Sequence, residues 1–261
     1  MGILNVTPDS FSDGGRYAGL DAALERARQI VAEGAAIIDV GGQSTRPGAL
    51  AVEEPVEIAR VVPVIEGIAA SCNVAISIDT SKPNVMRAAV AAGACIINDV
   101  YALREPRARA VAAESQAGLC LMHMKGEPRT MQDSPHYNDV VAEVMEFLAH
   151  ERGACIEAGV ASDAIALDPG FGFGKNLEHN LTLLRELPRF QALGAPLLVG
   201  VSRKSVIGKI LGKSVNERLY GGLGLAALAV ANGARIIRTH DVSPTVDAVR
   251  SVSAVLRGAA T

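Results

Sequence analysis

Eight short apolar runs, each followed by a segment with helical periodicity, constrain the fold of this chain more than any other feature. The runs lie at residues 2–6, 36–40, 75–78, 94–97, 119–122, 164–167, 197–201 and 235–239. Continuous apolar strands, rather than alternating ones, are typical of parallel sheets covered by helices. Eight βα repeats in 261 residues predict a single (β/α)8 TIM barrel over residues 1–261, with a doubly wound open sheet as the alternative.

The segments between these runs carry start and stop signals for helices. Helical periodicity covers 20–33 and 82–92, and a final helix is expected to begin with Ser243 as its cap and Pro244 in its first turn. The segment 216–232 is nearly apolar on all sides, although the outer helices of a barrel normally keep one polar face. We therefore expect a homodimer interface at this helix.

Composition excludes several classes of protein. A formal net charge of −3 provides no basic field for nucleic acid, so a bound anion would need a few placed cations. The longest uncharged apolar run, 219–231, is too short to cross a bilayer, and the sequence opens without the pattern of a secretory signal. The 4 cysteines form no Cys-x-x-Cys pair, so buried, reduced thiols are expected. We expect a cytoplasmic protein that binds neither nucleic acid nor membranes.

Polar residues follow every predicted strand. They are Asn5, Asp39, Asp79, Asn98 with Asp99, His123, Asp168, the segment 202–205, and Arg238 with His240. One polar strand end is often only a helix cap, but a barrel brings all eight carboxyl ends to one rim, where such proteins carry out their chemistry. Amides and carboxylates fall on the first six strands and cations on the last two. This division suits a ligand with a flat heterocycle and a phosphate group.

Three further motifs have simpler interpretations. The sequence GFGFGKN at 170–176 lacks the first glycine and the hydroxyl of the phosphate-binding pattern G-x-x-x-x-G-K-[ST], so Lys175 is expected to be a solvated loop residue. The spacing of the histidines does not favour a zinc site. Ser202 and Ser205 have no His/Asp relay at a suitable spacing, and we expect them to cap the next helix or to contact ligand.

The strand-end motifs resemble those of the dihydropteroate synthase family over nearly the whole chain. The matching segments are NVTPDSFSDGG (5–15), IDVGGQSTRPG (38–48), SIDTSKPNV (77–85), IINDV (96–100), LMHM (121–124), LDPGFGFGK (167–175), GVSRKS (200–205) and IIRTHDV (236–242). The resemblance implies a folate-pathway transferase and sulfonamide target with a pterin-binding barrel. It would join 6-hydroxymethyl-7,8-dihydropterin pyrophosphate to p-aminobenzoate and release pyrophosphate with the help of Mg²⁺.

The resemblance also implies a role for individual residues. The pterin would be held by Asp79, Asn98, Met122, Asp168 and Lys204, and the pyrophosphate by Asn5, Thr45, Arg46, Arg238 and His240. The p-aminobenzoate would contact Phe11, Thr45, Pro47, Phe173, Lys204 and Ser205, and Asn5 would also meet the metal. The catalytic set would be Asp13, Asp79, Asp168, Lys204, Arg238 and His240. Fixed groups of both signs suit a dissociative substitution, in which the pterin becomes cationic while the pyrophosphate gains negative charge.

The sequence departs from the family pattern at two places. Position 43 is Gln where the family usually has Glu, and nothing in the chemistry of that change predicts lost activity. Family members usually begin earlier, with a short hairpin that plugs the closed end of the barrel, and we expect this barrel to lack it. Two alternatives are a pterin-binding methyltransferase module and a catalytically silent paralogue. The intact STRPG loop and cationic residues favour the synthase over both.

Overall fold

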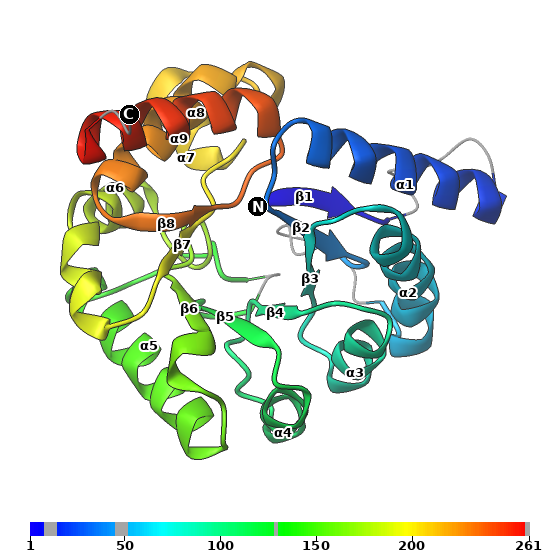
Figure 1. Cartoon of the computed structure of the whole chain (residues 1–261). Helices are drawn as coiled ribbons and strands as arrows, with labels where there is room; N and C mark the ends of the chain where they lie inside the picture. The colour runs from blue at the N-terminus through cyan, green and yellow to red at the C-terminus, as the bar shows by residue number, and fades with distance from the viewer. Residues whose placement is uncertain (8–14, 45–51, 128–129, 259–261) are drawn as a thin grey trace.

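The computed structural model describes residues 1–7, 15–44, 52–127 and 130–258, which form a ring of parallel strands surrounded by helices (Figure 1). The strands are β1 (Gly2–Asn5), β2 (Ile37–Gly41), β3 (Ala75–Asp79), β4 (Ile96–Asp99), β5 (Gly118–Met122), β6 (Ile165–Asp168), β7 (Leu197–Val199) and β8 (Ala234–Ile237). They pair in the order in which they occur along the chain. A parallel bridge between Gly2 and Thr239 closes the ring, which confirms the (β/α)8 barrel and excludes the open doubly wound sheet.

The helices cover the outside of this ring. They are α1 (Gly15–Ala32), α2 (Glu54–Ser71), α3 (Pro83–Ala91), α4 (Pro106–Ser115), α5 (Val140–Glu157), α6 (Leu177–Arg185), α7 (Ser205–Leu211), α8 (Leu219–Ala231) and α9 (Val242–Arg257). Short 3₁₀ helices are η2 (Ser162–Ala164), η3 (Leu187–Leu193) and η4 (Val215–Glu217). Within the part of the chain that the structure describes, no helix has the length and apolar character needed to span a membrane.

Two sequence expectations about helix ends are wrong in detail. The last helix begins at Val242 with Asp241 at its N-cap, so Ser243 lies inside the first turn instead of capping it. The apolar segment 216–232 is divided between η4 and α8, because a turn at Arg218 separates them. The strand boundaries differ from the apolar runs by up to two residues, and in β3 the polar end residue Asp79 still pairs with its neighbours.

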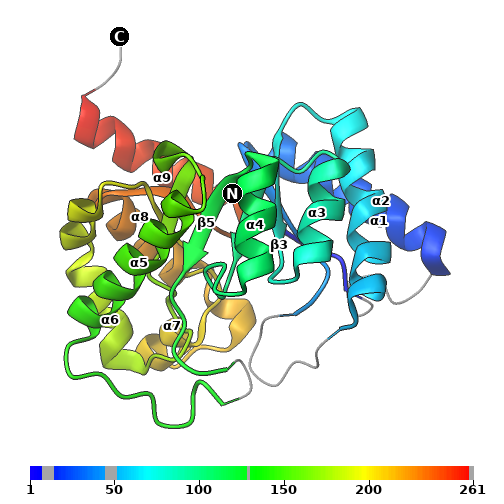
Figure 2. The same cartoon turned by 90° about the horizontal axis from the view of Figure 1, so that it is seen from below.

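Side chains alternate between the two faces of a strand. This alternation places apolar side chains in the outer layer and polar side chains in the interior of the barrel. In β3, Ile76 and Ile78 belong to the hydrophobic core beneath the helices, while Ser77 and Asp79 point to the opposite face. In β2, Ile38 flanks the fully buried Asp39 in the same way. The barrel interior is thus lined by hydrogen-bonding groups. Figure 2 shows the loop from β5 to α5 projecting at the end of the barrel where α7 lies.

Candidate active site

Arg238, which follows β8, joins three strands at the polar centre of the barrel. Its Nε donates a hydrogen bond to Asp39 Oδ2 at 2.6 Å, and its Nη2 donates to Asp79 Oδ2 at 2.7 Å. Asn98 Nδ2 also donates to Asp39 Oδ2, at 3.1 Å. The Asp39 side chain is 0% exposed, whereas 22% of the Arg238 side chain is exposed. Charge-assisted hydrogen bonds of this kind are strong and directional, so Arg238 and Asp79 have fixed positions.

The pKa values of Asp79 and Arg238 each depend on burial and on neighbouring charges, and these two influences act in opposite directions. Burial raises the pKa of Asp79 to about 7, although the charge of Arg238 opposes the shift. Burial alone would lower the pKa of Arg238, but the carboxylates of Asp39 and Asp79 outweigh it and hold that pKa above its ordinary value. Arg238 therefore stays charged, while Asp79 can exchange a proton near neutral pH. Asp39 Oδ1 and Asp79 Oδ1 are buried acceptors without a partner among the described residues.

Asp168, at the end of β6, and Lys204, at the N-cap of α7, form a second acid–base pair. Burial raises the pKa of Asp168 against the charge of Lys204, and burial lowers the pKa of Lys204 to about 8 against the charge of Asp168. The Lys204 ammonium donates to Phe171 O and lies 4.7 Å from the centre of the Phe173 ring. The site thus offers a cation above an aromatic ring beside a buried carboxylate.

An apolar wall completes this side of the site. Met122, at the end of β5, is 4% exposed and packs in a small cluster with Val100, Met124 and Met131. Phe173 packs against the same cluster. Asn98, on the neighbouring strand β4, is also buried. An apolar wall with a few placed polar groups is typical of sites for flat aromatic ligands.

The expectation of a solvated Lys175 is wrong, because the side chain is 2% exposed. Its ammonium donates to Gly170 O and Phe173 O, each at 3.0 Å, and lies 2.9 Å from His123 Nδ1. Burial lowers the pKa of Lys175 well below its usual value, and burial likewise lowers the pKa of His123 to about 2. His123 is therefore a neutral acceptor with a structural role. Lys175 holds together the loop that carries Phe173.

Glycines allow this loop to pass close to its neighbours. A Cβ atom at Gly170 would lie 1.9 Å from His123 O, and one at Gly174 would lie 2.1 Å from Lys125 O. Both residues also have positive φ values, +71° and +61°, which glycine adopts without strain. The glycine pattern in GFGFGKN therefore serves loop packing, with Lys175 as its internal hydrogen-bond donor.

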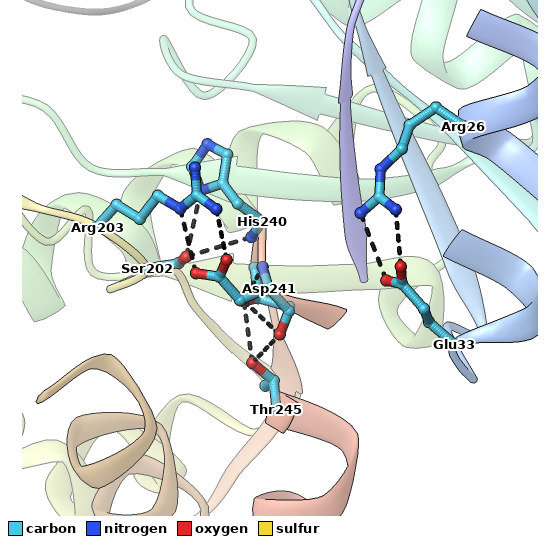
Figure 3. Close-up of polar contacts among 8 residues, drawn as sticks. Arg26, Glu33, Ser202, Arg203, His240, Asp241 and Thr245 are labelled. Carbon is cyan, nitrogen blue, oxygen red and sulfur yellow. Dashed lines mark hydrogen bonds and ion pairs between the residues drawn. The ribbon is translucent and has the colours of Figure 1, made fainter. Parts of the chain in front are cut away.

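His240 and Ser202 contact each other across the loops after β8 and β7 (Figure 3). The His240 backbone N–H donates to Ser202 Oγ at 3.2 Å, and His240 Nδ1 lies 3.2 Å from the same oxygen. Ser202 therefore binds a predicted site residue instead of capping α7, whose N-cap is Lys204. Ser205 is the exposed first residue of α7.

The remaining predicted site residues fall into two groups. Asn5 ends β1, and a Cβ atom at Gly41 on β2 would lie 3.8 Å from Asn5 Oδ1 and 3.7 Å from Asp79 Cβ on β3. Five predicted residues lie outside the described part of the chain, and they are Phe11, Asp13, Thr45, Arg46 and Pro47. Among the described residues, no group of three or more His, Cys, Asp or Glu side chains could hold a metal ion.

Sequence reasoning missed the roles of Asp39, Ser202 and Lys175. Asp39 was visible as a polar strand end, but its bond to Arg238 joins residues 199 positions apart. The burial of Lys175 had one usable signal, since three alternate glycines before it indicate a tightly packed loop. The cysteines also differ from expectation, because Cys95 is exposed while Cys120 and Cys155 are buried.

Comparison with known proteins identifies the relatives of this barrel. Residues 1–240 match the family model described as "Pterin binding enzyme". The dihydropteroate synthase of Escherichia coli (strain K12) is 53% identical over 256 residues, which cover 98% of this chain and 91% of the relative. The chain belongs to the dihydropteroate synthase family. This assignment confirms the resemblance in the strand-end motifs and favours the synthase over a methyltransferase module or a silent paralogue.

Solved dihydropteroate synthases share the whole fold. The enzyme from Yersinia pestis, determined with a sulfonamide drug complex, superposes with a TM-score of 0.94 at 48% identity, covering 99% of this chain and 94% of that one. The enzyme from Xanthomonas albilineans, determined in complex with 7,8-dihydropteroate, gives a TM-score of 0.89 at 45% identity and covers 98% of this chain and 92% of that one.

The Gln43 substitution relative to the usual family residue has a structural explanation. Gln43 Oε1 accepts hydrogen bonds from Lys82 Nζ at 2.5 Å and from the Val52 backbone N–H at 3.1 Å. Lys82 also forms an ion pair with the buried Glu57, so its charge is already compensated. An amide oxygen can therefore make the contacts of a carboxylate at this position, and no loss of activity is expected.

Proposed function

We propose that the acids and bases at the barrel mouth form the active site with which this chain performs the dihydropteroate synthase reaction. In this transferase reaction of folate biosynthesis, 6-hydroxymethyl-7,8-dihydropterin pyrophosphate and p-aminobenzoate condense to 7,8-dihydropteroate and pyrophosphate. The observation that carries the proposal is the meeting of Asp79 and Asp168, which end β3 and β6, with Lys204 and Arg238, which lie in the segments after β7 and β8.

The pterin ring fits the acidic side of this site. Asp79 Oδ1 is a buried acceptor without a partner among the described residues, and it can take an N–H of the heterocycle. Asn98 offers an amide close by, and Asp168 and Lys204 offer a second acceptor–donor pair. Met122 provides an apolar surface for the ring. These groups support pterin binding deep in the barrel.

The p-aminobenzoate and pyrophosphate fit the outer part of the mouth. Lys204 and the exposed Ser205 can bind a carboxylate while Phe173 contacts the aromatic ring, together with Phe11, Thr45 and Pro47 of the loops outside the described residues. The pyrophosphate is assigned to Asn5, Arg238 and His240, with Thr45 and Arg46 added from the second loop. A Xanthomonas albilineans dihydropteroate synthase has been solved with 4-aminobenzoic acid, which supports such a site in this chain.

Mg²⁺ is compatible with this arrangement. The donor at the end of β1 is a single amide oxygen, Asn5 Oδ1, and Mg²⁺ is commonly held by one or two protein oxygens plus substrate phosphates and waters. Asn5 would hold the ion together with the pyrophosphate. When bound, Mg²⁺ would neutralise negative charge on the leaving group.

The chemistry follows from where charge grows. As the bond between the pterin methylene carbon and the pyrophosphate oxygen breaks, Asp79 and Asp168 stabilise the positive charge on the pterin, with Asp13 added from the first loop. Arg238 and His240 stabilise the negative charge on the departing pyrophosphate. The aniline nitrogen then forms the new C–N bond and loses one proton. Fixed ion pairs suit this reaction because the charges need no reorganisation.

A pyrophosphate-release assay tests the proposal directly. Release from the pterin substrate should require both p-aminobenzoate and Mg²⁺ for full rate, and Arg238→Gln should lower kcat by at least about 100-fold, as removal of an electrostatic stabiliser typically does. Arg235→Gln, on β8 with an exposed side chain, is the matched control and should retain activity. Undiminished release by Arg238→Gln would refute the assigned site.

We also propose a cytoplasmic homodimer. The 4 cysteines are free thiols, which fits a reducing compartment. Helix α8 exposes Tyr220 and Leu228, and neighbouring α7 exposes Ile210 and Leu211. Several exposed large apolar side chains on two neighbouring helices support a subunit interface there.

A further inference from the structure

Four residues form a cluster that connects the loop after β7 with the loop after β8 (Figure 3). This cluster, Ser202, Arg203, His240 and Asp241, is called the 202–241 cluster. Arg203 Nε and Nη2 donate to the two carboxylate oxygens of Asp241 at 3.1 and 2.5 Å. Ser202 Oγ lies 3.2 Å from both the backbone nitrogen and the Nδ1 atom of His240. Two independent contacts therefore bridge the same pair of loops.

The backbone of Arg203 has a conformation that needs external support. Its φ angle is +58°, in the left-handed region that residues other than Gly, Asn and Asp rarely occupy. The Arg203 guanidinium is bound by Asp241, and the Arg203 carbonyl oxygen accepts a hydrogen bond from Arg218 Nη1 at 3.0 Å. Lys204 follows directly, so the direction in which its side chain leaves the loop depends on this turn.

The ion pair also sets the hydrogen bonding of His240. The Arg203 guanidinium holds the pKa of Asp241 below its usual value, and a hydrogen bond from the Ser202 hydroxyl contributes to the same effect. A serine hydroxyl has one proton, so when that proton goes to Asp241, the oxygen can only accept from His240. The imidazole is then held with a proton on Nδ1 and with its Nε2 edge directed away from Ser202.

We propose that Arg203 and Asp241 are positioning residues, which fix Lys204 on one loop and His240 on the other so that both side chains face the substrates together. The inference rests on the proposed roles of Lys204 and His240. Neither Arg203 nor Asp241 is assigned to substrate binding, so their effect passes through Lys204 and His240. Separation of the two loops would weaken pyrophosphate and p-aminobenzoate binding together.

The molecule contains a matched ion pair that joins no loops of the site. Arg26 donates to Glu33 through Nη1 at 2.7 Å and Nη2 at 3.4 Å, again in a bidentate arrangement (Figure 3). The side-chain exposures are 34% and 29% for this pair, and 43% and 20% for Arg203 and Asp241. Partly exposed pairs of either kind add little to stability. Arg26→Gln therefore controls for the loss of one partly exposed ion pair.

Steady-state kinetics of Arg203→Gln and Arg26→Gln test the inference. For Arg203→Gln we expect KM for p-aminobenzoate and Kd for inorganic pyrophosphate each to rise on the order of tenfold, since a misplacement of about 1 Å can cost about 100-fold. Thermal midpoints of the two variants should agree closely, and Arg26→Gln should match the wild type in both constants. If the wild type is active and Arg203→Gln has the same KM and Kd as the wild type, the inference is overturned. An inactive wild type would instead refute the proposed function.

Nitrogen NMR of His240 provides a readout that does not depend on turnover. In the wild type, Nδ1 should carry a proton in a hydrogen bond, and Ser202→Ala and Asp241→Asn should each shift the Nδ1 resonance. Asp241→Asn keeps the size of the side chain, which limits the risk of misfolding. A His240 spectrum that is identical in wild type and both variants would also overturn the inference.

Discussion

At the scale of single residues, the two oxygens of Asp79 have different surroundings. Oδ2 accepts from Arg238 at 2.7 Å, whereas Oδ1 is buried without a partner among the described residues. Oδ1 is therefore desolvated before any ligand binds. This burial disfavours the ionised carboxylate and raises the pKa of Asp79 to about 7. Ligand binding and proton release at Asp79 should therefore be coupled.

This coupling predicts a pH dependence of pterin affinity. Only the ionised carboxylate can accept from Arg238 at Oδ2 and from a ligand N–H at Oδ1, so the affinity should fall about tenfold per pH unit below the pKa of about 7. Titration calorimetry with a pterin between pH 5.5 and 8.5 would measure it. Asp79→Asn should bind more weakly at pH 8 and show no inflection near 7, and Asp79→Ala should abolish binding. The prediction is wrong if wild type and Asp79→Asn show the same profile.

At the scale of elements, the loop between β6 and α6 depends on one buried ammonium. Lys175 Nζ has three acceptors within 3.0 Å, from Gly170, Phe173 and His123. An ammonium has three protons, so these acceptors satisfy it completely. None of the described side chains forms an ion pair within 4.0 Å of this ammonium, so its hydrogen bonds and the more distant charge of Asp168 offset its burial. The loop and its lysine form one packed unit.

Removal of this ammonium should destabilise the protein. Lys175→Met keeps the side-chain length but leaves three acceptors unpaired, and we expect a loss of about 3 kcal/mol and a Tm lower by about 6–12 °C. Lys125→Met is the control, because Lys125 is 47% exposed and donates to His136 O and Glu143, so its loss should cost under about 1 kcal/mol. Urea and thermal unfolding of both variants provide the measurement. Equal losses would show that burial of Lys175 contributes no specific stability.

The elements differ in how far the sequence predicts them. The eight strands and the residue types at their ends follow from apolar runs and turn residues, because these signals are local. The bond between Asp39 and Arg238 and the contact of Ser202 with His240 are not local, since they depend on ring closure and on loop geometry. The partners of Lys175 are also not local: the alternate glycines before it indicate a tightly packed loop, but its contact with His123 joins residues far apart in the sequence.

At the scale of the whole molecule, the apolar surface of α7 and α8 lies on the outside of an otherwise complete barrel. Tyr220 is 82% exposed and Leu228 is 46% exposed, although α8 buries Ala226 and Ala229 against the barrel. Stable interfaces bury about 800 Å² on each partner, so the proposed interface would also include surface beside these two helices. A second copy of the chain related by twofold symmetry would cover the same patch on both subunits.

Light scattering after gel filtration tests this dimer. The wild type should have twice the monomer mass of 27.1 kDa, and the double variant Tyr220→Glu and Leu228→Glu should elute at the monomer mass, because charges at the core of an interface are strongly disfavoured. Val255→Glu is the control, since Val255 is 84% exposed on α9 and lies outside the proposed interface. That variant should remain dimeric with an unchanged Tm. A monomeric wild type, or a dimer that survives both charges on α8, would show that the exposed apolar residues serve another purpose.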